Sequence, residues 1–449
     1  MVKARLMRTI AVVGAGALVL TACGGDDDDA ADGSPAAGDE GAAEIATGVG
    51  VTEEPCPEAV NEDNGCIYLG VISDLSVGAF ASYGPEIVRG HEDYWQRVNE
   101  AGGISGFDVD VSANIQDGEY DPQVYPQAYL EIEPNVLALA ESLGTPQTQA
   151  ILSDMEADDV VGATSTWWSG WNFEEEDAGR VLESGSSYCF HSMSALDWVS
   201  ENREAPASVV SVGFPTDFGL DYAAGVQKWA EANEVEVQEY IETGPNAAVG
   251  NQDGVVQAIL DGQPDVVGLA VPPGEAAEIV GKAAAQGYTG TFLGFLASWN
   301  PALLGTDAAA AMEQLYLHVS TFESFGGASE AHQAMIETYG EGENPPNDGY
   351  TFGWVSQYPI QAVLERAAAN GDLTREGVVA AVDGTEVDFE GALPSVTLGG
   401  DPNENADRSV TINEVVLDGG EYGQGVAALE TGYVGPTAEA YEYTSACTS

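Results

Sequence analysis

The chain has 449 residues, of which 74 are aspartate or glutamate and 12 are lysine or arginine, so its formal net charge is -62. Such a negative field repels phosphate backbones and argues strongly against nucleic acid as a partner. The length permits large cores and suggests two or three domains, and the acidity fits either a saline habitat or an ordinary acidic exported protein.

The N-terminus has the pattern of an export signal. Lys3, Arg5 and Arg8 precede an apolar run over residues 9–22, which is too short to span a bilayer. The run ends in Leu20-Thr-Ala-Cys23, which resembles a bacterial lipobox, whose cysteine is lipidated and becomes the mature N-terminus. We therefore expect a signal peptide at 1–22 and a lipid anchor on Cys23; the alternative is a secretory signal with a chance cysteine.

The stretch that follows is dominated by Asp, Glu, Gly and Ala, with a run of aspartates from Asp26 to Asp29. It cannot bury enough apolar surface to fold, so we expect a lipidated acidic linker over residues 23–54. A metal-binding role for the aspartate run is the alternative to a solvated spacer.

Four cysteines remain besides the lipobox residue: Cys56, Cys66, Cys189 and Cys447. An even number in an exported chain suggests two disulfides, with three possible pairings. Pairing Cys56 with Cys66 is economical, since the short loop it closes gives about 2.5 kcal/mol. Cys189 with Cys447 would then pin the C-terminal tail to a second lobe, and we predict this pairing.

Residues 67–122 have the pattern of a βαβ unit. An apolar strand at 67–73 is followed by a loop at 74–83, an amphipathic helix and an alternating strand at 107–115. Such a unit seeds a parallel sheet, and ligands of these sheets bind beyond the carboxyl ends of the strands.

This unit also resembles a known family. Its segments LGVISDLSVGAFASYG, NEAGGISG and DGEYDP are similar to those of solute-binding proteins of branched-chain amino-acid type ABC importers, and the order of elements agrees over about 67–416. The resemblance implies an α/β, type I periplasmic-binding-protein fold: two Rossmann-like lobes with parallel sheets, joined by a multi-crossing hinge as a clamshell. It also implies an extracytoplasmic monomer that works with ABC permease and ATPase subunits. A βαβ unit of some other enzyme is the alternative.

Strands and helices continue to alternate after residue 122. We expect strands at 136–140, 159–163, 207–212, 235–241, 265–271, 291–296 and 314–320, and helices from 145 and at 219–233, 254–260, 274–286, 331–339 and 353–369, the last kinked at Pro359. Residues 396–416 alternate like a hairpin that turns at 401–407, which the resemblance implies is the third hinge crossing. The expected N-terminal lobe is 67–188 plus 321–405, and the C-terminal lobe is 189–320 plus 406–449.

The expected ligand site combines a helix N-terminus with hydroxyl and aromatic side chains at strand ends. Orphan amides at the Thr145 helix start favour a carboxylate, and the resemblance implies carboxylate binding there and at the hydroxyls of 164–166. Simple N-capping by Thr145 is the competing interpretation. The candidate ligand residues are Ser76, Tyr83, Thr145, Thr164, Thr166, Trp167, Phe218 and Trp299.

Catalytic, metal and cofactor motifs are not evident in the sequence. The four histidines lack metal-ligand spacing, and neither a nucleophile elbow nor a phosphate-binding loop occurs. Residues 401–407 are similar to a calcium loop but lack its glycine and its final glutamate, which favours a polar turn. We therefore expect a binding protein without catalytic, metal or cofactor residues; an enzyme on the same scaffold would need converging titratable groups.

The expected function is capture of a small polar or aromatic solute for an ABC permease; the alternative is a receptor of the same fold that senses an amide or amino acid. Amino-acid binders of this family hold the ammonium with an acid after the strand at 291–296, but residues 294–300 contain none. The family's tyrosine after the preceding strand is also absent, since Val271-Pro272-Pro273 stands there. We therefore predict a carboxylate, amide or aromatic ligand in preference to leucine, isoleucine or valine, although Asp217 or Glu275 could supply a counter-charge.

Overall fold

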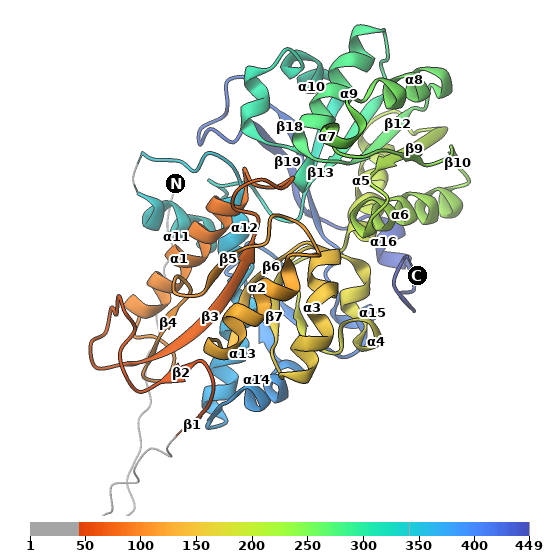
Figure 1. Cartoon of the computed structure of the whole chain (residues 1–449). Helices are drawn as coiled ribbons and strands as arrows, with labels where there is room; N and C mark the ends of the chain where they lie inside the picture. Colours follow the sequence, from red (N-terminus) through yellow and green to blue (C-terminus); the bar gives the residue numbers. More distant parts are fainter. Residues whose placement is uncertain (1–44, 341, 449) are drawn as a thin grey trace, which may run out of the picture. The chain divides into compact units, whose positions relative to one another are not determined.

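The computed structural model describes residues 45–340 and 342–448, which form two large β-sheets with flanking helices and two small two-stranded sheets (Figure 1). Among these residues the first sheet has seven strands in the order β2-β3-β6-β7-β8, with β4 and β5 both paired to β3. Its pairs are parallel apart from β2 with β3. The strands are β2 (Val51–Thr52), β3 (Gly65–Ser73), β4 (Phe107–Asp110), β5 (Ile115–Asp117), β6 (Ala138–Leu143), β7 (Gly162–Ser165) and β8 (Val181–Leu182).

The helices of this first half pack on both faces of its sheet, so β3 and β6 are almost completely buried, as expected for central parallel strands. Helix α12 packs closely against α1, and this approach requires glycine at position 353, since a Cβ there would meet the Ile87 carbonyl oxygen at 2.1 Å. The helices are α1 (Gly84–Glu100), α2 (Tyr125–Ile132), α3 (Thr145–Ala157), α11 (Glu330–Tyr339), α12 (Gly349–Val355), α13 (Gln357–Ala369) and α14 (Arg375–Val382).

The second sheet has the order β10-β9-β12-β13-β14-β18-β19, with β11 also paired to β9. It is parallel up to β14, after which β18 and β19 add antiparallel strands. The strands are β9 (Ser208–Gly213), β10 (Glu236–Val237), β11 (Ile241–Glu242), β12 (Val266–Ala270), β13 (Thr291–Phe295), β14 (Tyr316–Ser320), β18 (Val410–Val415) and β19 (Val426–Tyr433). The main helices beside it are α5 (Tyr188–Asn202), α6 (Asp217–Asn233), α8 (Asp253–Gly262), α9 (Pro273–Ala285) and α10 (Ala309–Leu315).

The chain passes between the two sheets at three places. It leaves the first sheet after β8 and enters α5 through residues 183–187. It returns after β14, through residues 321–329, to α11, which packs on α1. The last passage runs from α15 (Pro402–Asn405) to β18 through residues 406–409. Three passages between two sheets give the arrangement of a hinge.

Several expected elements differ from the structure. The hairpin expected at 396–416 is wrong: β17 (Val396–Thr397) pairs with β16 (Glu386–Val387), and the real hairpin joins β18 to β19. The alternating pattern at 396–416 therefore spans two strands that belong to different sheets. The helix expected at 353–369 is two helices that meet at Ser356, and Pro359 lies in the first turn of the second, where its missing N–H is tolerated.

Residues 45–54, the end of the expected linker, contain two short strands, while the rest of that linker, the signal peptide and Cys23 lie outside the described residues. Strand β1 (Ala46–Thr47) pairs with β15 (Asp372–Leu373), and β2 pairs with β3. Backbone pairing therefore ties the end of the acidic segment to the fold, which its composition did not indicate. The strand expected at 107–115 is interrupted and forms β4 and β5. The strand expected at 235–241 is likewise divided into β10 and β11. The strand expected at 314–320 is β14, which begins at Tyr316 because the two residues before it belong to helix α10.

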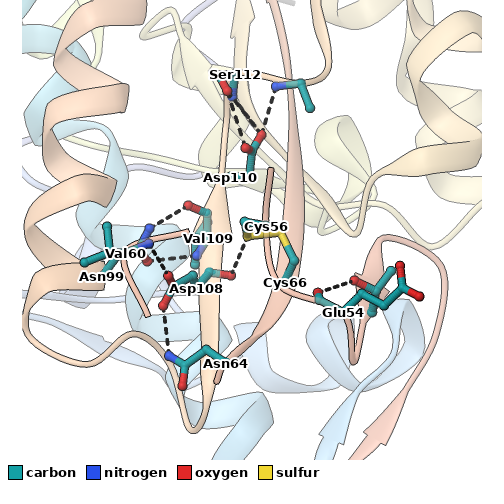
Figure 2. The surroundings of a disulfide bond; sticks show 12 residues. Glu54, Cys56, Val60, Asn64, Cys66, Asn99, Asp108, Val109, Asp110 and Ser112 are labelled. Carbon is teal, nitrogen blue, oxygen red and sulfur yellow. Dashed lines mark hydrogen bonds between the residues drawn. A yellow bond between two sulfur atoms is a disulfide. The ribbon is translucent and has the colours of Figure 1, made fainter. Parts of the chain in front are cut away.

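The loop before β3 is joined to β3 by a disulfide and to β4 by hydrogen bonds to Asp108 (Figure 2). Cys56 is paired with Cys66, and the Asp108 carboxylate accepts from the Asn64 side chain at 2.8 Å and from the Val60 amide at 2.9 Å. Beside it, Asn99 exchanges two buried hydrogen bonds with the Val109 backbone. The motif that begins at Asn99 therefore sets the position of β4 against the end of α1.

The C-terminal tail is fastened by the second disulfide, Cys189 with Cys447. Next to it, Asp221 of α6 accepts hydrogen bonds from the backbone amides of Ser169 and Cys189 and from the Thr448 hydroxyl. One buried carboxylate thus joins the loop after β7, the start of α5 and the end of the chain.

Candidate functional site

Loops that follow strands of both sheets line a narrow cavity of about 40 Å³. From the first half come the ends of β6 and β7, the residues after β3, β5 and β7, and parts of α1 and α12, and from the second half come residues around α5, α6 and β13. Eight of the 13 lining residues are aromatic. The lining residues are Phe80, Tyr83, Ile87, Tyr120, Leu143, Ser165, Trp167, Tyr188, Phe218, Phe295, Leu296, Ala297 and Phe352.

The aromatic rings of the two halves are in direct contact. Trp167 of the first half lies 5.6 Å from Phe295 of the second half and 4.7 Å from Phe352 of its own half, measured between ring centroids. Tyr188 lies 4.9 Å from Phe295 and 5.1 Å from Phe218. These contacts leave little free space, and they make the cavity a mainly apolar slot between the two sheets.

A chain of hydroxyl groups runs beside this slot. Thr145 and Thr166 hydrogen-bond to each other, and the Thr166 hydroxyl lies 3.0 Å from that of Tyr188. Gly144 precedes Thr145 with a φ of 98°, and a Cβ there would meet the Gln147 side chain at 2.2 Å, so glycine is needed at this turn. The turn presents the start of α3 to the opposite half.

An acidic side chain lies at the far end of that hydroxyl chain. Desolvation raises the pKa of Asp217, in the first turn of α6, to about 7, and the Thr145 hydroxyl partly offsets this rise. Tyr188 and Tyr120 line the cavity, and the pKa of each hydroxyl is raised by desolvation and, in addition, by the negative charge of Asp217. At neutral pH this carboxyl is therefore partly protonated and can both donate and accept hydrogen bonds.

A second acid lies beneath the floor of the cavity. Ser165 lines the cavity and donates its hydroxyl to Glu141, a residue of β6 that is 0% exposed, at 2.8 Å. Burial raises the pKa of Glu141 to about 8 and lowers that of the nearby His91 to about 3. Although Glu141 and the His91 ring are 4.0 Å apart, both are neutral at pH 7, so the pair is not a salt bridge.

The sequence-based candidates divide into those near the cavity and those elsewhere. Tyr83, Trp167 and Phe218 line the cavity, and Thr145 and Thr166 form the hydroxyl chain beside it. Thr164 is buried and its hydroxyl donates to the Thr166 carbonyl, which supports the turn instead.

Two candidates lie away from the cavity. Ser76 is exposed, in the loop that follows β3. Trp299 is 3% exposed, donates its indole N–H to the Gln424 carbonyl and stacks on Tyr316, so it packs in the core. A position after a strand was not enough to place either residue at the cavity.

Several lining residues were missed by sequence reasoning. Phe295 ends β13 and Tyr120 follows β5, so both could have been found by the same rule that selected Trp167. Tyr188 begins α5, just after the first passage between the sheets. Phe352 lies in α12, far along the chain from the other lining residues, and no local signal indicates that this helix reaches the cavity.

Within the part of the chain that the structure describes, no group of three or more His, Cys, Asp or Glu side chains could hold a metal ion. The buried rings of His91, His191 and His318 all have pKa values lowered to about 3 by desolvation, which keeps them neutral. None of the helices in the described ranges has the length and hydrophobicity needed to cross a bilayer.

Residues 67–421 match a family model described as periplasmic binding protein. None of the curated proteins matches the sequence. Solved structures with the same fold include a fatty acid ABC transporter substrate-binding protein from Thermomonospora curvata, at 24% identity and a TM-score of 0.77, covering 90% of this chain and 98% of that one.

Two further structures cover most of this chain at lower identity. A solute-binding protein of an ABC transporter from Rhodopseudomonas palustris in complex with p-hydroxybenzoic acid is 17% identical, with a TM-score of 0.67, covering 83% of this chain and 98% of that one. A branched-chain amino acid ABC transporter protein from Thermus thermophilus with bound valine is 16% identical, with a TM-score of 0.70, covering 84% and 98%. These similarities establish a common fold.

Proposed function

This chain belongs to the periplasmic binding protein family, and on that premise we propose that it captures a small solute with an apolar or aromatic body and one polar end. The observation that carries the proposal is the slot between the two sheets, most of whose lining residues are aromatic. Aromatic and aliphatic walls gain energy by covering apolar surface, whereas a polar solute would lose its water there without replacement.

The polar end of the solute is proposed to meet the hydroxyl chain of Thr145, Thr166 and Tyr188. Hydroxyl groups donate and accept, so they suit a carboxylate, an amide or a phenol. The walls beyond β13 are Leu296 and Ala297, which offer no charge to an ammonium group. Enclosing an ammonium without a full counter-charge costs several kcal/mol, and Asp217 beside the hydroxyl chain is only partly ionised at neutral pH, so leucine, isoleucine and valine are disfavoured.

The ligands of two proteins with the same fold support this solute class. One is a fatty acid binding component, and the other contains p-hydroxybenzoic acid, so each ligand combines an apolar body with a carboxylate. The valine-bound relative has the same fold and shows that the fold alone does not select this class.

Capture requires the slot to open. Its volume of about 40 Å³ is far below the roughly 300–1,000 Å³ of ordinary small-molecule sites. We take residues 67–188 plus 321–405 as one lobe and 189–320 plus 406–449 as the other, a division supported by the three passages between the sheets. Solute-dependent closure of these lobes should reduce the radius of gyration in solution scattering.

We also propose that the protein is held at the membrane by a lipid on Cys23 and delivers its solute to an ABC permease. Its support is the family match and the lipobox-like Leu20-Thr-Ala-Cys23, which lies outside the described residues. The proposed location is therefore the outer face of the cell membrane.

The test is calorimetric titration of the whole mature protein with 4-hydroxybenzoate, octanoate and the three branched-chain amino acids. We expect at least one monocarboxylate to bind and none of the amino acids to do so. Phe218→Ala removes a lining ring that is 6% exposed and should weaken binding about ten- to a hundredfold. Tyr433→Ala, on edge strand β19 away from the cavity, is the matched control and should bind as the native chain does. Micromolar binding of leucine, unaffected by Phe218→Ala, would refute the proposal.

A further inference from the structure

The C-terminal tail, residues 441–448, lies against both halves of the molecule. Tyr443 is 1% exposed, and its ring contacts one ring of each half: Phe173 of the first half at 5.0 Å and Phe190 of the second at 4.8 Å, measured between centroids. Its hydroxyl donates to the Ser169 carbonyl of the first half at 2.7 Å. A single side chain of the tail therefore joins the two halves.

A second link is made by Cys447. Its sulfur is bonded to Cys189, at the start of α5 in the second half, and its backbone amide donates to the Ser169 hydroxyl of the first half at 2.7 Å. The Ser169 hydroxyl donates in turn to the Asp221 carboxylate of α6. Because a hydroxyl can accept one hydrogen bond while it donates another, the tail amide and Asp221 hold Ser169 together.

The third link is the hydroxyl of Thr448. It accepts from the indole N–H of Trp168 in the first half at 3.2 Å and donates to Asp221 in the second half at 3.3 Å. Tyr443, Cys447 and Thr448 thus each contact both halves, so the tail crosses the boundary between them at three points.

The anchor points of the tail lie next to rings that line the aromatic slot. Each anchor is at most three residues away in the sequence from one lining ring. The pairs of anchor and lining residue are Ser169 with Trp167, Cys189 with Tyr188, and Asp221 with Phe218. Asp221 and Phe218 are on the same face of α6, since residues three apart are neighbours on a helix. The tail therefore holds the backbone segments that carry rings from both walls of the slot.

We propose that the C-terminal tail is a latch, bonded covalently to the second half and hydrogen-bonded to the first, which holds the slot closed over its solute. The latch rests on the proposed function, because it takes the slot as the solute site. When the slot opens, Ser169 and Trp168 move away from the tail and their hydrogen bonds to it break. The disulfide keeps the tail in place for the next closure. Bonds that break only on opening slow the release of solute.

The test compares the full mature protein with the double variant Tyr443→Phe, Thr448→Val, which removes two tail hydroxyls and keeps the ring and the disulfide. Stopped-flow release of 4-hydroxybenzoate should be at least about tenfold faster in this variant, because two hydrogen bonds to the first half are lost, and association should not slow. Tyr443→Phe alone keeps the Thr448 bridge and should release about threefold faster than the native chain.

Solution scattering of the solute-free protein is the second measurement, and it does not depend on what the slot binds. The double variant should have a larger radius of gyration than the native chain, because its halves are held together less firmly. Tyr441→Phe is the matched control from the same tail, with its ring on Phe190 and Lys228 of the second half. It should behave as the native chain does in both measurements.

Faster release or a larger radius of gyration in the double variant, without the same change in the control, supports the latch. An unchanged release rate together with an unchanged radius would overturn it, and so would an equal change in Tyr441→Phe. If the native chain does not bind 4-hydroxybenzoate, the proposed solute class loses that support, and the scattering comparison alone decides whether the tail is a latch.

Discussion

Replacing Glu141 by glutamine should stabilise the protein, and by more at neutral than at acidic pH. Glu141 is fully buried, and burial raises its pKa from 4.5 to about 8. Between the pKa of the unfolded chain and the higher pKa of the folded state, the folded protein holds a proton that the unfolded chain has released. The free energy of unfolding therefore falls as pH rises from the unfolded pKa to the folded pKa. Glutamine has no proton to gain or lose, so Glu141→Gln removes this dependence.

The magnitude follows from the shift. At pH 7 the folded state still holds the proton that the unfolded chain has released, which costs about 3 kcal/mol, against about 1 kcal/mol at pH 5. The glutamine carbonyl can still accept from Ser165, while its amide must find a new partner, a cost that is the same at both pH values. The advantage of the variant should therefore grow by about 2 kcal/mol between pH 5 and pH 7.

Urea unfolding of the native chain and of Glu141→Gln at both pH values measures this difference. Glu337→Gln, an exposed position on α11, is the matched control and should show no pH-dependent gain. If the gain of Glu141→Gln were the same at pH 5 and pH 7, the reasoning about the buried acid would be refuted.

Three other outcomes are expected. Asn99→Ala removes two buried hydrogen bonds to Val109 and should lower the free energy of unfolding by about 2–4 kcal/mol, and a loss below 0.5 kcal/mol in urea unfolding would contradict the role given to this motif. Ionised Asp217 repels a bound carboxylate, so the affinity for 4-hydroxybenzoate should fall as pH rises through about 7 and should become pH-independent in Asp217→Asn; calorimetry at pH 6 and pH 8 decides this. Cys23→Ser should release the protein from membranes or leave its signal uncleaved, as membrane fractionation and mass spectrometry would show; normal processing and membrane retention would remove the anchor from the account.

The order of elements was predictable because the local signals are strong. The apolar run at 67–73 lies within β3, and α3 begins at Thr145, one residue earlier than the capping pattern predicted, with Gly144 as its N-cap and no side-chain cap. Signals of this kind depend only on neighbours in the sequence. The late part was not predictable in the same way, since the alternation at 396–416 does not say that its two ends pair in different sheets.

The candidate site was predictable to the extent that strand ends carry it. Trp167 and Phe218 follow strands whose carboxyl ends meet the cavity, so the rule for parallel sheets found them. The same rule selected Trp299, but its indole turns into the core and binds a carbonyl there. Phe352 reaches the cavity through the packing of α12 on α1, which is a tertiary contact that no local pattern encodes.

Mass spectrometry can identify the small molecule that is released when the protein, purified under mild conditions from its native host, is denatured, and this identifies the class of solute. We expect a stoichiometric compound with an apolar or aromatic body, one carboxylate, amide or phenol, and no primary amine. Stoichiometric leucine, isoleucine or valine would contradict this expectation.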